Sequence, residues 1–164
     1  MDAVKKYRIQ GVLLALFIFA TDQAVKYMVS HPLNLKERVQ IEIISIFNLT
    51  WAENRGVSMG LLTADTDTAR WLLVALTGII ATMVLIWMFR EQLRGEILAL
   101  ALVLGGALGN ITDRARFGFV IDYADLHFGA FRPFLIFNIA DAAITVGVVI
   151  LLARALFIRN KEAT

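Results

Sequence analysis

The sequence contains no cysteine and only two histidines among its 164 residues. The absence of cysteine excludes disulfide bonds, a thiol nucleophile and cysteine-ligated metal sites. His31 and His127 are too few for a convincing histidine metal site, so we expect neither a metal nor another cofactor. Charged residues are also scarce at 18%, whereas a soluble domain usually carries about 25%. The composition therefore argues against a soluble protein.

Hydrophobic residues make up 59% of the chain, which indicates an integral membrane protein. A membrane-spanning helix needs about 20 mostly apolar residues. We expect four such helices, at about 9–28, 70–89, 96–112 and 136–157. With no internal repeat and no separate soluble segment, residues 1–164 are interpreted as a single membrane-embedded domain.

The first apolar run could be confused with a cleavable signal peptide. No small-residue cleavage pattern follows it, and polar residues (Asp22, Gln23 and Lys26) occupy its far end. We therefore interpret it as a retained first helix. Asp22 and Lys26 are four residues apart and share one helix face. They form either an ion pair near the interface, with Lys26 reaching the lipid headgroups, or a support for a polar site.

Basic residues suggest how the chain is oriented. Four spans place both termini on the same side, and the short segments on that side are rich in bases: Lys5, Lys6, Arg8, Arg90, Arg94, Arg154, Arg159 and Lys161. A similar number is spread over two longer loops at 29–69 and 113–135. Because positive charge in short segments marks the cytoplasmic side, we expect cytoplasmic termini and extracytoplasmic loops.

Each of these outer loops contains a segment with the alternation of a β-strand. Residues 39–51 alternate over a strand-length run, and so do residues 118–124. We expect two strands that pair with each other. The segment after Asn54 (NRGVSMGLL) is apolar enough to contact lipid, and Asn54 and Gly56 have the composition of a tight turn.

Asp141 is the strongest candidate for a chemical role. It lies in an apolar run, with Asn138 three residues earlier on the same helix face. An isolated charge there must meet water, a partner or a proton. Three acids are available as partners in the neighbouring loop: Asp113, Asp122 and Asp125.

Spacing alone does not choose among these three acids. Asp113 has Arg114 and Arg116 as neighbours with which to pair, and Asp125 is open to interpretation as a solvated loop residue. Asp122 is preferred because it lies on a strand with apolar neighbours. Two adjacent carboxyl groups share a proton, so one activates water while the other polarises a carbonyl and protonates the leaving amine. This is aspartyl peptide hydrolysis.

Two other features carry weaker signals. Gly105 and Gly109 are in a G-x-x-x-G relation, which commonly allows helices to pack closely. Serine chemistry is less favoured because the serines lie in no nucleophile-elbow motif, although a Ser–Lys pair using Lys26 stays open at this point.

Several blocks of the sequence together are specific. They are TDQAVK, with Asp22 and Lys26; NRG, with Asn54 and Gly56; GGALGNITDR, with Asn110, Asp113 and Arg114; GFVIDY, with Asp122; and FNIAD, with Asn138, Ala140 and Asp141. Over nearly its full length the chain resembles the bacterial lipoprotein signal peptidases (signal peptidase II). One departure is NRGVSMG, where this family often has NxGAAF.

The resemblance implies an all-α membrane protein of four transmembrane helices, with a small extracytoplasmic β-sheet that cradles the substrate. It implies that Asp122 and Asp141 are the catalytic dyad, supported by Asn54, Gly56, Asn110, Asp113, Arg114, Asn138, Ala140, Asp22 and Lys26. The implied substrate is a diacylglyceryl-modified prolipoprotein, cleaved before its lipidated cysteine near the outer face of the bacterial cytoplasmic (inner) membrane. Membrane lipid and globomycin-type inhibitors are the other implied partners, and no nucleic acid is expected.

Two further hypotheses are kept beside the peptidase. A small proton- or cation-coupled transporter would use Asp22, Asp113 and Asp141 as relay groups, although the sequence has neither an internal repeat nor paired broken helices. A structural membrane subunit would tolerate asparagine at both dyad positions.

Overall fold

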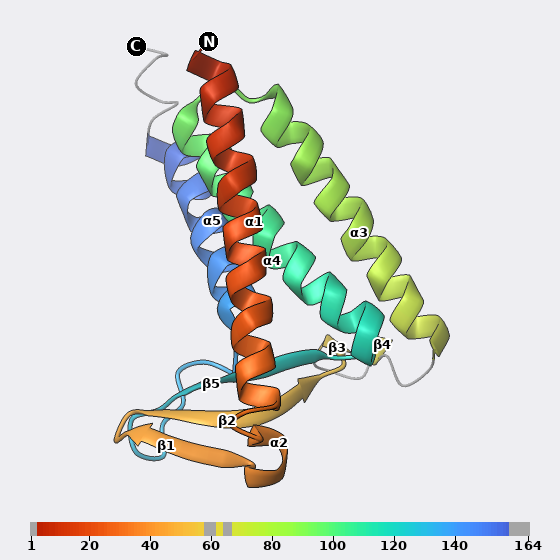
Figure 1. Ribbon diagram of the computed structural model, residues 1–164. Helices are drawn as coiled ribbons and strands as arrows, with labels where there is room; N and C mark the ends of the chain where they lie inside the picture. Colours follow the sequence, from red (N-terminus) through yellow and green to blue (C-terminus); the bar gives the residue numbers. More distant parts are fainter. Residues whose placement is uncertain (1–2, 58–61, 64–66, 158–164) are drawn as a thin grey trace.

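The computed structural model describes residues 3–57, 62–63 and 67–157. Four helices in this part of the chain are long and apolar enough to cross a membrane: α1 (Ala3–Ser30), α3 (Asp67–Arg90), α4 (Arg94–Phe117) and α5 (Ile139–Phe157). The start of α1 and the end of α5 lie at one end of the bundle, and a small sheet lies at the other (Figure 1). The predicted fold class, four spanning helices with a small sheet, is confirmed.

Helix α4 is the centre of the bundle and packs against α1, α3 and α5 (Figure 1). Its glycines permit this close approach. A side chain on Gly105 would meet the backbone of Ala15 in α1, and one on Gly106 would meet the carbonyl of Ala140 in α5. The close packing predicted from the G-x-x-x-G spacing is therefore present, and α4 uses glycine towards both neighbours.

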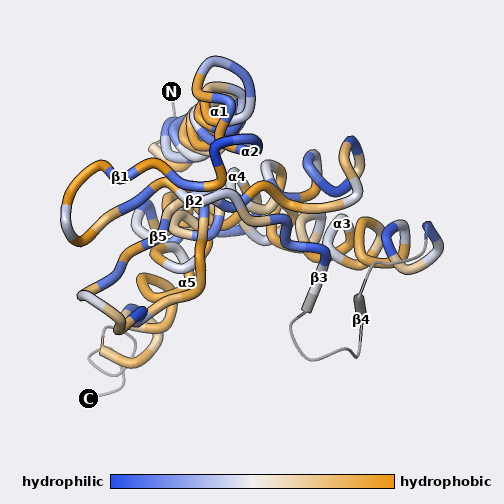
Figure 2. Tube along the Cα trace, turned by 90° about the horizontal axis from the view of Figure 1, so that it is seen from below, coloured by the Kyte–Doolittle hydropathy of each residue, from blue (hydrophilic) through white to orange (hydrophobic). Residues whose placement is uncertain are grey.

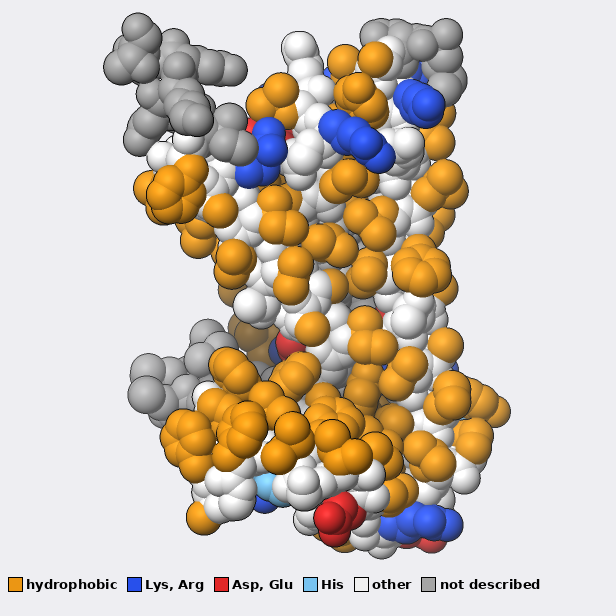
Figure 3. All heavy atoms as spheres, turned by 90° about the vertical axis from the view of Figure 1, so that its left-hand side faces the viewer, with side chains coloured by type: hydrophobic (Ala, Val, Ile, Leu, Met, Phe, Trp, Pro, Cys, Tyr) orange, Lys and Arg blue, Asp and Glu red, His pale blue; other side chains and the backbone are white. Residues whose placement is uncertain are grey.

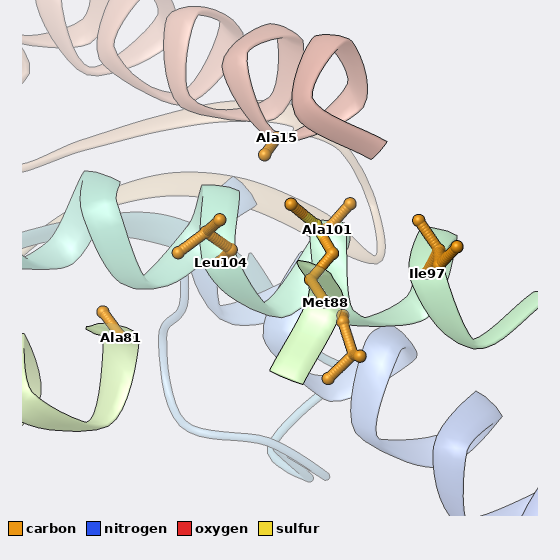
Figure 4. Packing of buried hydrophobic residues seen from close by; sticks show 7 residues of the cluster. Ala15, Ala81, Met88, Ile97, Ala101 and Leu104 are labelled. Carbon is orange, nitrogen blue, oxygen red and sulfur yellow. The ribbon is translucent and has the colours of Figure 1, made fainter. Parts of the chain in front are cut away.

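Small and large apolar side chains alternate in the core between α1, α3 and α4. Figure 4 shows Ala15 from α1 and Met88 from α3 directed towards Ala101 of α4. Met88, Ile97 and Ala101 are fully buried. Because lipid is as apolar as these side chains, their contribution is close packing rather than exclusion of water.

The extramembrane sheet has three antiparallel strands in the order β1–β2–β5, with β1 at Gln40–Ile44, β2 at Phe47–Asn54 and β5 at Val120–Leu126 (Figure 2). The predicted pairing between the two loops is confirmed, because Asn54 pairs with Val120 and Ala52 with Asp122. A short pair, β3 (Gly56–Val57) and β4 (Leu62–Thr63), follows β2, and a one-turn helix, α2 (Leu35–Arg38), precedes β1. Residues 58–61 of the segment expected to contact lipid lie outside the described residues.

The prediction of one strand over 39–51 is wrong, because the chain turns at Ser45–Ile46 and forms a hairpin. The turn contains no glycine, proline, asparagine or aspartate, and its one turn-forming residue, Ser45, is a weaker signal. The apolar residues around it continue the alternation and conceal the reversal.

The third spanning helix also differs from its expected bounds. It continues to Phe117 and ends where Gly118 adopts a left-handed conformation (φ 85°). Asp113 and Arg114 therefore lie on α4 rather than in the following loop. The polar residues at 110–114 face other polar groups inside the protein. The lower hydropathy of this segment therefore indicates the polar site and not the end of the helix.

Candidate active site

Asp122 and Asp141 line the same cavity although they come from different elements. Asp122 lies on β5, and Asp141 lies in the first turn of α5. The cavity has a volume of about 840 Å³ and is walled by the end of β2 and the loop before α5. The Asp122 side chain is buried, whereas Asp141 is half-buried. The structure therefore brings together the two acids preferred from the sequence.

The beginning of α5 is a capping box. The Asp141 amide donates to Asn138 Oδ1 at 2.8 Å, and the Asn138 amide donates to Asp141 Oδ2 at 3.3 Å. Such reciprocal bonds satisfy two amides that the helix leaves unpaired. The sequence spacing predicted that Asn138 shares a helix face with Asp141. Asn138 is instead the residue that precedes α5. The same motif that starts the helix fixes one carboxylate of the site.

Asn138 also holds the second carboxylate. Its Nδ2 donates to Asp122 Oδ1 at 2.6 Å and contacts Asn110 Oδ1 at 3.2 Å and the Ile121 carbonyl at 3.3 Å. The side chain is almost completely buried. A buried carboxamide with both ends in use has one stable orientation. Asn138 therefore sets the position of Asp122 and Asp141 relative to each other.

Asn110 on α4 contacts Asp141 from the opposite direction. Its Nδ2 donates to Asp141 Oδ1 at 2.8 Å, while its Oδ1 accepts from Lys26 Nζ at 3.2 Å. Asp141 is consequently held by donors to both of its oxygens.

A buried ion cluster lies behind these groups. Lys26 Nζ is 2.8 Å from Asp22 Oδ2 and 2.8 Å from Asp113 Oδ2, and none of the three side chains is more than 3% exposed. Of the two alternatives for Asp22 and Lys26, the structure favours the support of a polar site, because Lys26 is buried and does not reach the headgroups. Asp113 forms its ion pair with Lys26 rather than with Arg114 or Arg116. Lysine lies inside because two carboxylates compensate its charge.

The carboxylates of this cluster are connected to the backbone of the site. Asp22 Oδ1 accepts from the Ala140 amide at 3.0 Å, and Asp113 Oδ2 accepts from the Ile121 amide at 3.2 Å. Ala140 and Ile121 are the immediate neighbours of Asp141 and Asp122. The cluster thus joins α1 and α4 to the two segments that carry the dyad.

Sequence reasoning missed Gln23 as part of this cluster. Its Nε2 donates to Asp22 Oδ2 at 3.2 Å and to Asp113 Oδ1 at 3.0 Å. The available signal was a carboxamide next to an acid in an apolar run. Arg70 was also missed: its guanidinium caps the end of α4 through the carbonyls of Arg114 and Ala115.

Asn54 reaches the site from the first outer loop. Its side chain hydrogen-bonds Asp122, and its Oδ1 accepts from the Gly56 amide at 3.2 Å. Gly56 has a φ of 137°, which other residues rarely adopt. The tight turn interpreted from the sequence is present, and it aims Asn54 at the dyad.

Arg114 lies within electrostatic range of Asp113, Asp122 and Asp141. Its Nε is buried and has no hydrogen-bond partner among the described residues. Asp125, which the sequence left open as a solvated residue, is buried: its side chain is 1% exposed and accepts from Arg132 Nε at 3.1 Å. Asp125 lies on β5, where it binds Arg132 of the loop that walls the cavity, and it is not part of the dyad.

Burial, and after it the nearby charge of Asp141, raise the pKa of Asp122 to about 7, against hydrogen bonds from Asn54 and Asn138 that favour ionisation. Near neutral pH this carboxyl group therefore holds its proton for much of the time. In the described part of the chain, no group of three or more His, Asp or Glu side chains is arranged to hold a metal ion.

Comparisons with known proteins agree on one family. The family model of signal peptidase (SPase) II matches residues 14–157. The chain is 58% identical to a lipoprotein signal peptidase of Sphingopyxis alaskensis over 92% of this chain and 87% of that protein. It is 51% identical to one of Rhizorhabdus wittichii, over 98% and 94% respectively.

Solved structures also match this fold. A bacterial membrane enzyme determined by the in meso method at 1.9 Å resolution superimposes with a TM-score of 0.77 at 29% identity, over 90% of this chain and 93% of that chain. The matched residues include every residue that lines the cavity. This chain belongs to the signal peptidase II family.

Proposed function

We propose that this protein removes the signal peptide from diacylglyceryl-modified prolipoproteins, with Asp122 and Asp141 as its catalytic residues. The observation that carries the assignment is one buried residue, Asn138, that binds both carboxyl groups at one cavity: its side chain donates to Asp122 and its backbone amide donates to Asp141. Membership of the signal peptidase II family supports the reaction. Nothing in the comparisons supports the transporter alternative.

Each aspartate has a distinct role in this proposal. Asp141 is half-buried, lines the cavity and receives hydrogen bonds on both oxygens, and we assign it the role of general base. It accepts a proton from a water molecule that attacks the scissile carbonyl. Asp122, with a pKa of about 7, retains its proton, polarises that carbonyl and then protonates the leaving amine.

Arg114 supplies positive charge beside the dyad. Its buried Nε has a hydrogen available, with no acceptor among the residues the structure describes. A peptide carbonyl or the oxygen of the tetrahedral intermediate is an acceptor of the right chemistry. We assign Arg114 to binding and stabilising the substrate, and Asn54 to orienting Asp122.

We assign part of the substrate's lipid to a second, apolar cavity of about 320 Å³ that adjoins Asp141. Its lining includes Phe134, Leu135, Ala142 and Val146, and it opens beside α5. A diacylglyceryl group attached next to the scissile bond would occupy such a surface. Cyclic lipopeptides of the globomycin type would compete for the same two cavities.

The chain's charges support the orientation of the enzyme. Bases gather in the short segments at the ends of α1, α3 and α5 opposite the sheet. The positive-inside rule makes that end cytoplasmic. The dyad, at the sheet end of the helices, then lies near the outer face of the bacterial inner membrane.

A cleavage assay on purified protein tests the proposal. A precursor lipoprotein, with and without its diacylglyceryl group, is incubated with the wild type, Asp122→Asn, Asp141→Asn and the matched control Asp67→Asn, whose carboxylate is exposed. We expect the wild type and the control to shift only the lipidated precursor on a gel. Full activity of both dyad variants would refute the assigned mechanism, and equal cleavage of both precursors would refute the substrate.

A further inference from the structure

Large apolar side chains are exposed along the β1–β2 turn and on the loop between β5 and α5. They form what we name the apolar rim: Ile43, Ile44, Ile46, Phe128, Phe131, Phe134 and Leu135. Phe131 is 65% exposed and Leu135 is 80% exposed. An exposed apolar patch next to a polar surface marks an interaction site.

The two parts of the rim form one surface because the backbone joins them. The His127 amide donates to the Ile46 carbonyl at 3.0 Å, which attaches the loop to the turn. Phe128 and Phe131 exchange backbone hydrogen bonds of 2.8 and 3.2 Å across the tip of the loop. Figure 3 shows apolar side chains gathered on this side of the sheet, with charged side chains below them. The loop therefore presents its rings in one fixed direction.

The polar groups of the same loop are directed elsewhere. Arg132 pairs with Asp125, whose other oxygen accepts from Thr50 at 3.1 Å on β2. This arrangement fastens the loop to the sheet on its polar side and leaves its apolar side without a partner in the described chain. A segment of this kind has one polar face and one apolar face, which is typical of structure that lies in a membrane interface.

The neighbouring helix ends indicate which occupant covers the rim. Three helices carry an exposed aromatic residue close to their sheet end: Tyr27 in α1, Trp71 in α3 and Phe117 in α4. Aromatic residues at such positions form a belt at the level of the lipid headgroups. In the sequence of α5, however, the first aromatic residue is Phe157, at the opposite end.

The rim supplies the part of the belt that α5 lacks. Phe134 and Leu135 precede α5 by only a few residues, so the apolar rim is continuous with the lipid-facing surface of that helix. We propose that the apolar rim is an interfacial anchor, seated at the headgroup and acyl-chain boundary of the outer leaflet. Phe134 and Leu135 also wall the dyad's cavity, so the anchor fixes the depth of the cavity mouth in the leaflet.

The absence of cysteine allows a direct test by site-directed spin labelling in phosphatidylcholine–phosphatidylglycerol vesicles. Single cysteines are introduced as Phe131→Cys and Ile44→Cys, one on each part of the rim. Glu37→Cys on α2 is the water-exposed control, and Leu76→Cys, on an exposed position of α3, is the lipid-exposed control. Power saturation then compares collisions of each nitroxide with oxygen and with a water-soluble nickel chelate.

We expect both rim labels to collide with the nickel chelate several-fold less often than the label at position 37, and with oxygen nearly as often as the label at position 76. Nickel accessibility equal to that at position 37 would overturn the proposal. Protection of the rim labels from nickel together with dipolar broadening would also overturn it, if the broadening disappears when labelled protein is diluted with unlabelled protein. That result would mean that a second copy of the protein covers the rim. None of these readings depends on peptidase activity, so the anchor and the proposed function stand or fall separately.

Discussion

The ammonium of Lys26 donates to the carboxamide oxygen of Asn110 at 3.2 Å. The same oxygen also accepts from Asn138, so the Asn110 amide group is left to face Asp141 at 2.8 Å. A carboxamide turned by 180° would place its oxygen against a carboxylate. The charge of Lys26, on the first helix, therefore fixes the orientation of a group that binds the proposed base.

Replacing this lysine tests that relationship. Lys26→Met retains the length of the side chain but leaves Asp22 and Asp113 buried without their cation. Removing one partner of a buried ion pair typically costs about 3–5 kcal/mol, and the carboxamide of Asn110 loses the donor that orients it. We expect a large fall in the thermal unfolding temperature in detergent, together with loss of cleavage.

The matched control is Lys36→Met, which removes an exposed pair with Glu53. Such pairs contribute about 0–1 kcal/mol, so its unfolding temperature and activity should stay close to those of the wild type. Equal behaviour of the two methionine variants would mean that the buried cluster is not needed.

The pH dependence of cleavage follows from the pKa of Asp122, about 7. The active form needs Asp122 protonated, so kcat/KM should fall as the pH rises through about 7. Asn54→Leu removes a hydrogen bond that favours the ionised form, so its alkaline limb should lie at higher pH. The measurement is kcat/KM on a lipidated precursor across this range, with Gln92→Leu at the opposite end of the bundle as the control. An unshifted limb in Asn54→Leu would contradict the role given to Asn54.

Stability should depend on pH through the same residue. The folded pKa of Asp122, about 7, lies above its ordinary value of 3.8. The folded wild type is therefore most stable below the unfolded pKa of Asp122, and it loses stability as the pH rises through the folded pKa. At about 1.4 kcal/mol per pKa unit this amounts to at most about 4 kcal/mol.

Asp122→Asn, which does not titrate, lacks this loss. We expect its unfolding temperature to exceed that of the wild type at alkaline pH, and the difference to shrink on acidification. An advantage independent of pH would contradict the linkage. Substitution of a catalytic residue commonly raises stability while it lowers activity.

Much of the site was accessible from the sequence because its residues stand in apolar surroundings. Asp141 and Lys26 were noticeable as charges in membrane-length runs, and Asp122 as an acid on an apolar strand. Strand pairing between the outer loops also followed from their alternation. These inferences rest on periodicity and on the free energy of burying charge, both of which are local properties of the chain.

What the sequence did not reveal depends on contacts between distant segments. Lys26 pairs with Asp113 across 87 positions of sequence, so no local pattern shows that this lysine is inside rather than among the headgroups. Asp125 looks solvated until Arg132 and Thr50 are placed around it. The turn at Ser45 was missed for a different reason, since a single serine is a weak turn signal.

The junction of α1, α4 and α5 should be sensitive to a single methyl group. A side chain on Gly109 would collide with the carboxylate of Asp22 and contact Ala140, whereas one on Gly78 would meet nothing within 4 Å. We expect Gly109→Ala to lower the unfolding temperature and activity, because overpacking costs about 1–3 kcal/mol and here displaces an ion-paired carboxylate. Gly78→Ala should behave as the wild type does. If both variants match the wild type in thermal unfolding and cleavage, the close approach at Gly109 is not required.

The loop that walls the cavity should depend on the pair of Asp125 and Arg132. Although burial opposes ionisation, hydrogen bonds from Arg132 and Thr50 hold the pKa of Asp125 below its usual value of 3.8. The pair therefore stabilises the protein above that unfolded value, and its contribution is lost as the pH falls through the folded pKa. Arg132→Met should lower stability by about 1.5–3 kcal/mol near pH 7, the value of a hydrogen bond to a charged group.

The same variant should raise KM for the lipidated precursor more than it lowers kcat, because Arg132 and the loop line the cavity while the dyad is held by Asn138. The double variant Arg132→Met/Asp125→Asn no longer leaves a buried carboxylate without its cation, so part of the lost stability should return. Arg38→Met, at an exposed position on α2, is the control for removal of an arginine. Steady-state kinetics and thermal unfolding at two pH values distinguish the outcomes. If the loss of stability in Arg132→Met persists when Asp125 is protonated, Arg132 acts through something other than Asp125. The same conclusion would follow if the double variant did not recover stability.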